Sequence, residues 1–140
     1  MDRNKASQVV EVVINHLNDL GVIDSRIIVA GSFRRGKKKD LHDVDFIIQD
    51  EDKNGNRERI EVLDEPVDLV YSSAECLGPA LLYLTGSKWN NIRMRKKAQQ
   101  KDWKLSQYGL FNQDGERIDE NNEQSIYDLL ELEYLQPEKR

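Results

Sequence analysis

Apolar and polar residues follow two different periods in the first half of the chain. Between residues 4 and 20 the apolar positions recur every three or four residues, which predicts an amphipathic helix that ends at Gly21. Three later runs are apolar or β-branched and short enough to be buried strands: residues 26–30, 44–48 and 67–71. An Asn-Gly turn at residues 52–56 predicts a hairpin that leads from the second run into residues 60–63.

The second half of the chain has the pattern of helices around one small ribbon. A helix is expected to begin near Pro79. Ser87 is expected to cap a basic helix that runs to about Lys101. Residues 103–118 are typical of a β ribbon, and Ser125 is expected to cap a short acidic helix.

These elements predict an α+β fold in two lobes. The chain of 140 residues suffices for one compact domain or two small lobes. We expect a mixed sheet with flanking helices over residues 1–78 and a small mixed α/β lobe over residues 79–140. No apolar stretch approaches the length of a membrane span, and the charged N-terminus is not typical of a signal peptide. The expected location is therefore intracellular, in the cytoplasm or at the nucleoid, with a viral origin left open.

Charge is distributed unevenly along the chain. The net charge is −5, which alone argues against a nucleic-acid partner. However, residues 31–39 carry five Lys or Arg and no acid, and residues 86–104 carry seven against one acid. Eight acids gather in residues 111–135. Grouped basic residues can bind a polyanion despite a negative total, although solvated helix faces would give the same pattern.

Cysteine and histidine are too scarce for two common kinds of site. The single cysteine, Cys76, excludes an internal disulfide framework and fits a reducing compartment. Together with only two histidines, it does not supply an ordinary tetrahedral zinc site.

Three aspartates are the candidate catalytic and metal-binding residues. Asp43 and Asp45 lie two residues apart in a strand-like run, so alternation would place both carboxylates on one face. Asp68 lies in a separate predicted strand, and the three converge if the strands pair. Carboxylates this close repel one another unless a cation lies between them, and Mg²⁺ prefers oxygen ligands. With a nucleoside triphosphate they could hold two Mg²⁺ ions about 4 Å apart.

The Gly31-Ser32 pair supplies a candidate phosphate-binding turn. It follows a predicted strand directly, and Ser32 is expected to cap a short helix over residues 33–39. Glycine allows close approach of the backbone to a phosphate, and free N–H groups at a helix start favour an anion. An ordinary strand-to-helix turn is the alternative interpretation.

The combined motifs resemble family X DNA polymerases, the family of DNA polymerase beta. The segment Gly31-Ser32-Phe33-Arg34-Arg35-Gly36, followed by Asp43-Val44-Asp45, resembles the palm signature of that family. Tyr83-Leu84-Thr85-Gly86-Ser87 is similar to its Tyr-Phe-Thr-Gly-Ser motif, and two C-terminal segments also match. The family's lyase domain and helix-hairpin-helix segments have no counterpart in these residues, so the resemblance is to the palm and the C-terminal nucleotide-selecting lobe.

The resemblance implies a role for each matching residue. Asp43 and Asp45 would bridge two Mg²⁺ ions, with Mn²⁺ as an alternative, while Asp68 would bind the catalytic ion and accept the proton of the primer 3′-hydroxyl. The implied nucleotide-binding residues are Gly31, Ser32, Arg35, His42, Tyr83, Leu84, Gly86, Lys88 and Asn91. The implied DNA-binding residues are Arg95, Lys96 and Lys97.

Two departures from the family pattern affect these roles. Leu84 replaces an aromatic residue that helps to exclude ribonucleotides, so the sugar preference is open. Pro66 replaces a basic residue that often steadies the third aspartate, so Asp68 is expected to be held less rigidly. Trp89 is expected to pack within its lobe, with a contact to DNA as the alternative.

The sequence therefore predicts a DNA-directed DNA polymerase that acts in repair or gap filling. Its expected partners are a DNA primer-template and a dNTP, with no membrane partner, and the chain is expected to be a monomer. One alternative is a non-polymerising or template-independent nucleotidyltransferase with another acceptor. A second is a DNA-binding accessory module with a degenerate active site, against which the intact aspartate trio argues.

Overall fold

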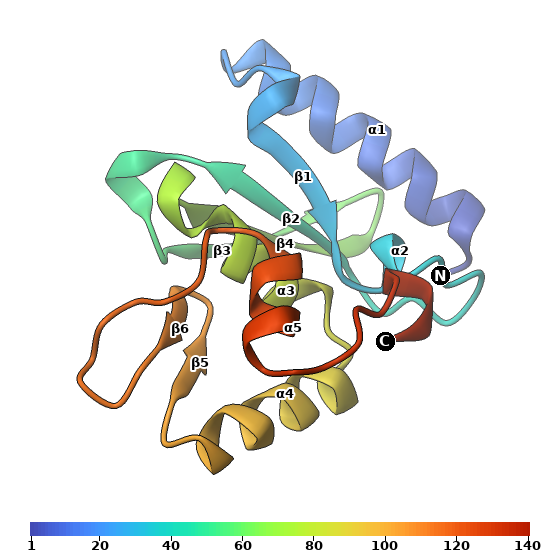
Figure 1. Cartoon of the computed structure of the whole chain (residues 1–140). Helices are drawn as coiled ribbons and strands as arrows, with labels where there is room; N and C mark the ends of the chain where they lie inside the picture. The colour runs from blue at the N-terminus through green and yellow to red at the C-terminus, as the bar shows by residue number, and fades with distance from the viewer. The chain divides into compact units, whose positions relative to one another are not determined.

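The computed structural model describes all 140 residues and divides them into two compact units. The first unit is Met1–Ala74 and the second is Glu75–Arg140. Both mix helices with strands (Figure 1), so the predicted α+β class is confirmed. No helix is long and apolar enough to cross a membrane.

The first unit begins with the amphipathic helix α1, Arg3–Asp19. Asp2 caps it by accepting a hydrogen bond from the backbone N–H of Lys5 at 2.8 Å. Its buried side chains recur at helical spacing: Ala6, Val9, Val13 and Leu17. The predicted helix and its ending before Gly21 are confirmed.

A four-stranded sheet forms the rest of this unit, in the order β1-β2-β4-β3. The strands are β1 (Ile27–Ala30), β2 (Val44–Gln49), β3 (Arg57–Val62) and β4 (Glu65–Ser72). β2 runs parallel to β4 and antiparallel to β1, while β3 runs antiparallel to β4. The sheet is therefore mixed, as predicted.

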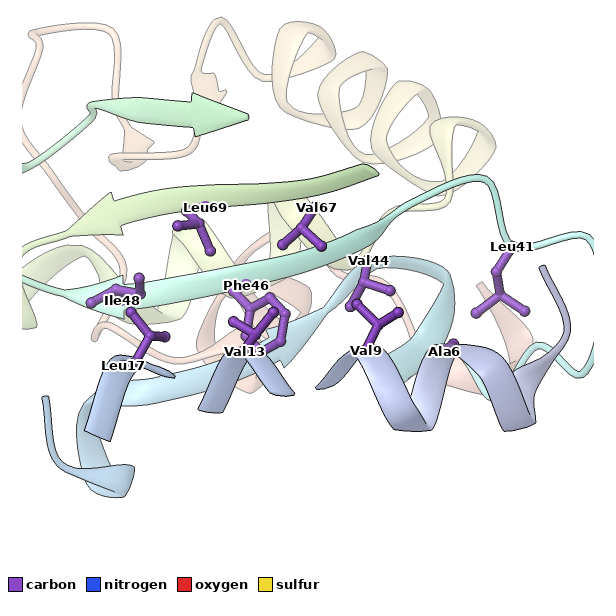
Figure 2. Close-up of a cluster of buried hydrophobic side chains, with 10 residues drawn as sticks. All are labelled: Ala6, Val9, Val13, Leu17, Leu41, Val44, Phe46, Ile48, Val67 and Leu69. Carbon is purple, nitrogen blue, oxygen red and sulfur yellow. The ribbon is translucent and has the colours of Figure 1, made fainter. Parts of the chain in front are cut away.

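The core of this unit lies between α1 and one face of the sheet (Figure 2). Val44, Phe46 and Ile48 of β2 point towards the helix, as do Val67 and Leu69 of β4. Successive residues of a strand face opposite sides. Asp45 and Asp68, between those apolar residues, therefore project from the other face of the sheet.

The predicted hairpin at residues 52–56 is wrong. β2 does not pair with β3, because β4 lies between them. The tight hairpin instead joins β3 to β4 through Leu63 and Asp64, both of which have positive φ. β3 is the more exposed strand and suits an edge, whereas β4 carries the buried Val67, Leu69 and Val70 and suits the interior.

The short helix after β1 also differs from prediction. α2 covers Gly31–Arg34, and its N-cap is Ala30 without a side-chain hydrogen bond. Ser32 therefore lies within the helix rather than at its cap, and residues 37–39 are not helical.

The second unit contains three helices and a two-stranded ribbon. The helices are α3 (Leu77–Thr85), α4 (Lys88–Gln100) and α5 (Glu123–Leu129), and the strands are β5 (Lys104–Ser106) and β6 (Gly109–Phe111). Ser87 caps α4 by accepting from the backbone N–H of Asn90, as predicted. The cap of α5 is Asn122 rather than Ser125, whose backbone N–H donates to the Asn122 side chain at 2.7 Å.

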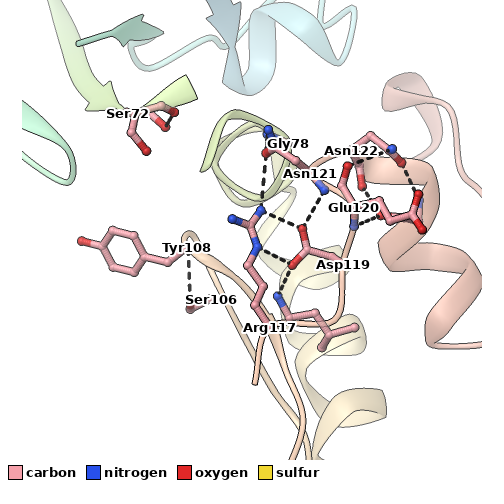
Figure 3. Close-up of polar contacts among 12 residues, drawn as sticks. Ser72, Gly78, Ser106, Tyr108, Arg117, Asp119, Glu120, Asn121 and Asn122 are labelled. Atoms are coloured by element: carbon pink, nitrogen blue, oxygen red, sulfur yellow. Dashed lines mark hydrogen bonds and ion pairs between the residues drawn. The ribbon is translucent and has the colours of Figure 1, made fainter. Parts of the chain in front are cut away.

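A buried carboxylate organises the loop between β6 and α5 (Figure 3). The side chain of Asp119 is fully buried and accepts hydrogen bonds from the Arg117 guanidinium and from the backbone N–H groups of Leu110 and Asn121. These donors lower the pKa of Asp119 against the opposing effect of burial. Asn121 in turn accepts from the backbone N–H of Gly78 at 3.0 Å, which ties this loop to α3.

The final residue closes the second unit. Arg140 has a fully buried side chain that donates to Glu123 at 2.7 Å and to the carbonyl of Leu135 at 2.9 Å. Its guanidinium carbon lies 5.5 Å from the ring centroid of Tyr127 and 5.3 Å from that of Tyr134. The C-terminal segment is thereby fixed against α5.

Candidate active site

The three predicted aspartates meet on one face of the first unit. Asp45 and Asp68 are direct partners in the parallel register of β2 and β4, and Asp43 lies just before β2 begins. One carboxylate oxygen from each residue lies within 4.8 Å of the others. The convergence expected if the strands paired is thus present, and it follows from a single register.

Burial and mutual repulsion act on these carboxylates together. The pKa of Asp45 is raised to about 7, first by burial and then by the charges of Asp43 and Asp68. The pKa of Asp43 is also raised, again mainly by burial and then by Asp68. A bound cation would offset this repulsion and stabilise the ionised carboxylates.

The donor set fits a hard divalent cation. Three carboxylates on adjacent backbone segments offer only oxygen ligands, the type that Mg²⁺ and Mn²⁺ prefer. Neither cysteine nor histidine belongs to the cluster, so a soft-ligand metal does not suit it. Asp43, Asp45 and Asp68 are therefore the residues that would hold the metal.

Arg59 is a site residue that sequence reasoning missed. Its Nη1 donates to both oxygens of Asp68, at 3.0 and 3.1 Å, and lies 4.0 Å from an oxygen of Asp43. Arg59 is the register partner of Asp68 on β3. The expectation of a loosely held Asp68, based on Pro66, is therefore wrong, because the guanidinium of Arg59 on the neighbouring strand β3 holds the carboxylate. Only the β3–β4 register could have revealed this.

Gly31 allows the turn after β1 to approach the aspartates. Its φ of 62° is in the left-handed region, and a Cβ at this position would overlap the Asp45 carboxylate. The carboxylate of Asp45 also lies within electrostatic reach of Arg35, whose own pKa is lowered by burial. The phosphate-binding candidates Gly31 and Arg35 therefore stand beside the metal-binding candidates.

The other candidates of this unit occupy the same segment. Ser32 is half-buried in α2, whereas His42 is exposed and its charge lowers the pKa of Asp43 slightly against burial. The N-terminus holds this segment in place. Arg3 donates to the carbonyls of Phe33 and Lys37, and the amino group of Met1 donates to the carbonyl of Leu41 at 2.8 Å.

The remaining candidates gather on α3 and α4 of the second unit. The Asn91 side chain donates to the Tyr83 carbonyl at 2.8 Å, and the Arg95 guanidinium lies 5.4 Å from the Tyr83 ring centroid. Leu84 is half-buried, Gly86 is buried, and Lys88 and Lys96 are exposed, while Lys97 is half-buried. Tyr83, Asn91 and Arg95 thus form one group.

A cleft of about 470 Å³ adjoins that group within the second unit. It lies between α3, α4 and the β5–β6 ribbon, and its lining includes Tyr83, Arg95, Trp103, Lys104 and Tyr108. Aromatic rings next to cations suit a nucleotide or nucleic-acid ligand.

Two protein-family models match the chain. The model described as DNA polymerase beta palm matches residues 1–108, and the one described as DNA polymerase beta thumb matches residues 80–140. The palm match covers well over half of the sequence. This chain belongs to the DNA polymerase beta family. The resemblance read from the motifs is thereby confirmed.

One curated relative is similar over part of the chain. DNA polymerase IV of Saccharomyces cerevisiae is 42% identical over 64 residues, which are 46% of this chain and 11% of the yeast protein. The chain thus matches only a small part of that relative. What the yeast enzyme does is therefore carried to this chain only as a proposal.

Proposed function

We propose that this chain is a metal-dependent DNA polymerase that adds deoxynucleotides to a primer 3′-hydroxyl and releases pyrophosphate. The observation that carries the proposal is the register of β2 and β4, which makes Asp45 and Asp68 neighbours and gathers them with Asp43. The matches to the polymerase palm and thumb support a polymerase over other nucleotidyltransferases.

In this proposal the aspartates organise the phosphoryl transfer. Two bound Mg²⁺ ions would neutralise the phosphates and favour ionisation of the 3′-hydroxyl. Asp43 and Asp45 would hold both ions, and Asp68 would hold one and accept the hydroxyl proton. Arg59 would keep the Asp68 carboxylate oriented through its two hydrogen bonds.

The substrates would be held by the residues of the matching sequence motifs. Ser32, Arg35 and the backbone of Gly31 and His42 would bind the triphosphate. Tyr83, Leu84 and Gly86 would line the sugar, Lys88 would lie beside the base, and Asn91 would reach its edge. Arg95, Lys96 and Lys97 would contact the DNA. We also propose that the chain has two functional parts. Residues 1–78 would form the catalytic palm, and residues 79–140 would form the lobe that selects the nucleotide.

Primer extension tests this function. Gapped, recessed and single-stranded substrates should be compared, with deoxy- and ribonucleotides in parallel. The size of the protein in solution tests whether it is a monomer. Template-directed extension with deoxynucleotides is expected, and preference for the gap would support a repair role. Addition without regard to template would instead identify the template-independent transferase. If ribonucleotides are incorporated, the variant Leu84→Phe tests the cause. A loss of ribonucleotide incorporation in that variant would assign it to Leu84.

Substitution of Asp68 separates chemistry from binding. Asp68→Ala and the isosteric Asp68→Asn are expected to abolish extension while DNA binding stays nearly unchanged, because the carboxylate acts on the hydroxyl and the ion. Glu61→Ala, an exposed acid on β3, is the matched control and should extend normally. Extension that survives in both Asp68 variants would overturn the proposal.

A further inference from the structure

Trp89 is exposed on the first turn of α4. Its relative exposure to solvent is 56%, whereas Asn90, Met94 and Ala98 of the same helix are buried. The expectation that Trp89 packs within its lobe is therefore wrong. One exposed aromatic residue is unremarkable by itself, so its surroundings decide what it can do.

Arg93 lies beside the Trp89 indole and is fixed by a hydrogen bond to Asn90. Its guanidinium carbon is 5.2 Å from the Trp89 ring centroid, and its Nη2 donates to the Asn90 side-chain oxygen at 3.1 Å. Asn90 is itself buried and donates to the Tyr127 hydroxyl at 3.1 Å. The Trp89–Arg93 pair is therefore a cationic aromatic platform with one ring face engaged and the helix core fixing its position.

The charged residues of α4 itself are all basic. α4 carries Lys88, Arg93, Arg95, Lys96 and Lys97 and no acid. Lys96 and Lys97 form no ion pair, whereas Lys101, just beyond the helix, pairs with Glu131 at 3.2 Å. Helical spacing brings Lys96 and Lys97 to the side of Trp89 and Arg93, seven and eight residues after the tryptophan. Asn91 and Arg95, in contrast, lie towards Tyr83.

We propose that Trp89, Arg93, Lys96 and Lys97 form a strip that binds single-stranded DNA. An unpaired base stacks on the free face of Trp89, and the phosphates that follow it contact the two lysines. An exposed ring next to unpaired cations complements a strand whose bases have open faces and whose backbone is anionic. Bases within a duplex are already stacked, so a duplex would use the lysines and leave the indole without a role.

This assignment rests on the proposed function in one respect, since the strand would be the unpaired template beyond the primer end. The binding itself needs neither metal nor nucleotide. It is therefore tested without both, in the full chain carrying Asp68→Asn, so that failure of polymerase activity and failure of the strip give separate results.

Binding of a labelled oligothymidylate and of a blunt duplex, followed by fluorescence anisotropy, tests the strip. Trp89→Ala is expected to weaken oligothymidylate binding by about 5- to 100-fold, to leave duplex binding within about twofold, and to be rescued largely by Trp89→Phe. Ile92→Ala is the matched control, since it removes an exposed apolar side chain, 41% accessible, from the same helix without removing a ring. This control should change neither affinity.

Several outcomes would overturn the proposal. Unchanged oligothymidylate affinity in Trp89→Ala would remove the stacking role, and an equal loss on the duplex would show that the strip does not read unpaired bases. Equal losses in Ile92→Ala and Trp89→Ala would indicate a general apolar contact. Thermal unfolding of each variant confirms that the helix is intact, and Trp89→Phe keeps the test decisive if Trp89→Ala is destabilised.

Discussion

At Asp45 the fold holds a carboxyl group where its ionised form is disfavoured. Burial is the main cause, and the two neighbouring carboxylates add to it. The same three groups become favourable ligands once a divalent cation is present, because the cation replaces repulsion by attraction. One residue thus couples the protonation state, the metal and the stability of the first unit.

The raised pKa of Asp45, about 7 against an ordinary value of 3.8, gives a signed prediction for stability. Because the folded state holds the proton more tightly than the unfolded state, stability in EDTA should fall as pH rises from about 4 to above 7. Asp45→Asn should remove most of this loss, because Asp43 contributes the rest, and should be more stable than the parent at pH 8 by at most about 4 kcal/mol. Thermal unfolding of the parent and the variant in EDTA at about pH 4 and at pH 8 measures this difference in stability.

Metal supplies the control for this prediction. Added Mg²⁺ or Mn²⁺ should raise the unfolding temperature of the parent at pH 8 and do so much less at pH 5, where protons compete for Asp45. In Asp45→Asn the metal effect should be weak at either pH. Equal stability of parent and variant at pH 8 in EDTA would show that Asp45 ionises without cost.

Arg59 shows how a neighbouring strand can support a catalytic side chain. Its hydrogen bonds to both oxygens of Asp68 fix the direction of that carboxylate, although the arginine itself is 60% exposed. Arg59→Ala is therefore expected to lower kcat for extension by about 10- to 100-fold with little change in KM for the dNTP, and Arg59→Lys should recover part of the loss.

Steady-state extension kinetics measure this effect. Arg26→Ala, an exposed arginine of the same unit, is the charge-matched control and should leave kcat unchanged. A merely structural role for Arg59 would lower the unfolding temperature without a selective fall in kcat. An unchanged kcat in Arg59→Ala would show that the contact with Asp68 does not serve the reaction.

At the scale of elements, local signals were predictable and pairing was not. Ser87 caps α4 as predicted, because the capping hydrogen bond joins residues three apart. The hairpin at residues 52–56 failed because β4, later in sequence, lies between β2 and β3. An Asn-Gly turn specifies a change of direction but does not specify which strand becomes the neighbour.

The same distinction applies to the candidate site. Asp43, Asp45 and Asp68 could be found from residue type and alternation, since each alternates with apolar residues that must face the core. Arg59 could not, because its contact depends on the register of two strands. At α5 two polar residues compete for the capping position, and Asn122 takes it while Ser125 donates to the Asn122 carbonyl.

The C-terminal segment gives a prediction at this scale. Arg140→Ala would remove the guanidinium that pairs with the buried Glu123, so the free energy of unfolding should fall by about 3–5 kcal/mol. The double variant Glu123→Gln with Arg140→Met removes both charges and should recover much of that loss. Chemical denaturation of the three proteins measures it. Similar stability of Arg140→Ala and the parent would mean that the buried pair contributes little.

At the scale of the whole molecule, the net charge is negative but the basic residues are grouped in two segments. The chain carries −5 overall, yet its basic residues concentrate in residues 31–39 and 86–104. Long-range repulsion from DNA and short-range attraction at these segments therefore oppose each other. Salt screens both, but counterion release from phosphates follows only the short-range contacts.

DNA binding by the whole chain should therefore weaken steeply with salt in spite of the negative net charge. If Arg95, Lys96 and Lys97 each neutralise a phosphate, the affinity should fall about 40-fold between 50 and 200 mM salt. Lys96→Ala should reduce the slope of log affinity against log salt by about one. Lys139→Ala, an exposed lysine outside both basic segments, should leave the slope unchanged. Because repulsion by the acidic segments is itself screened, an affinity that stays constant or rises with salt would mean that these three residues do not contact the DNA backbone.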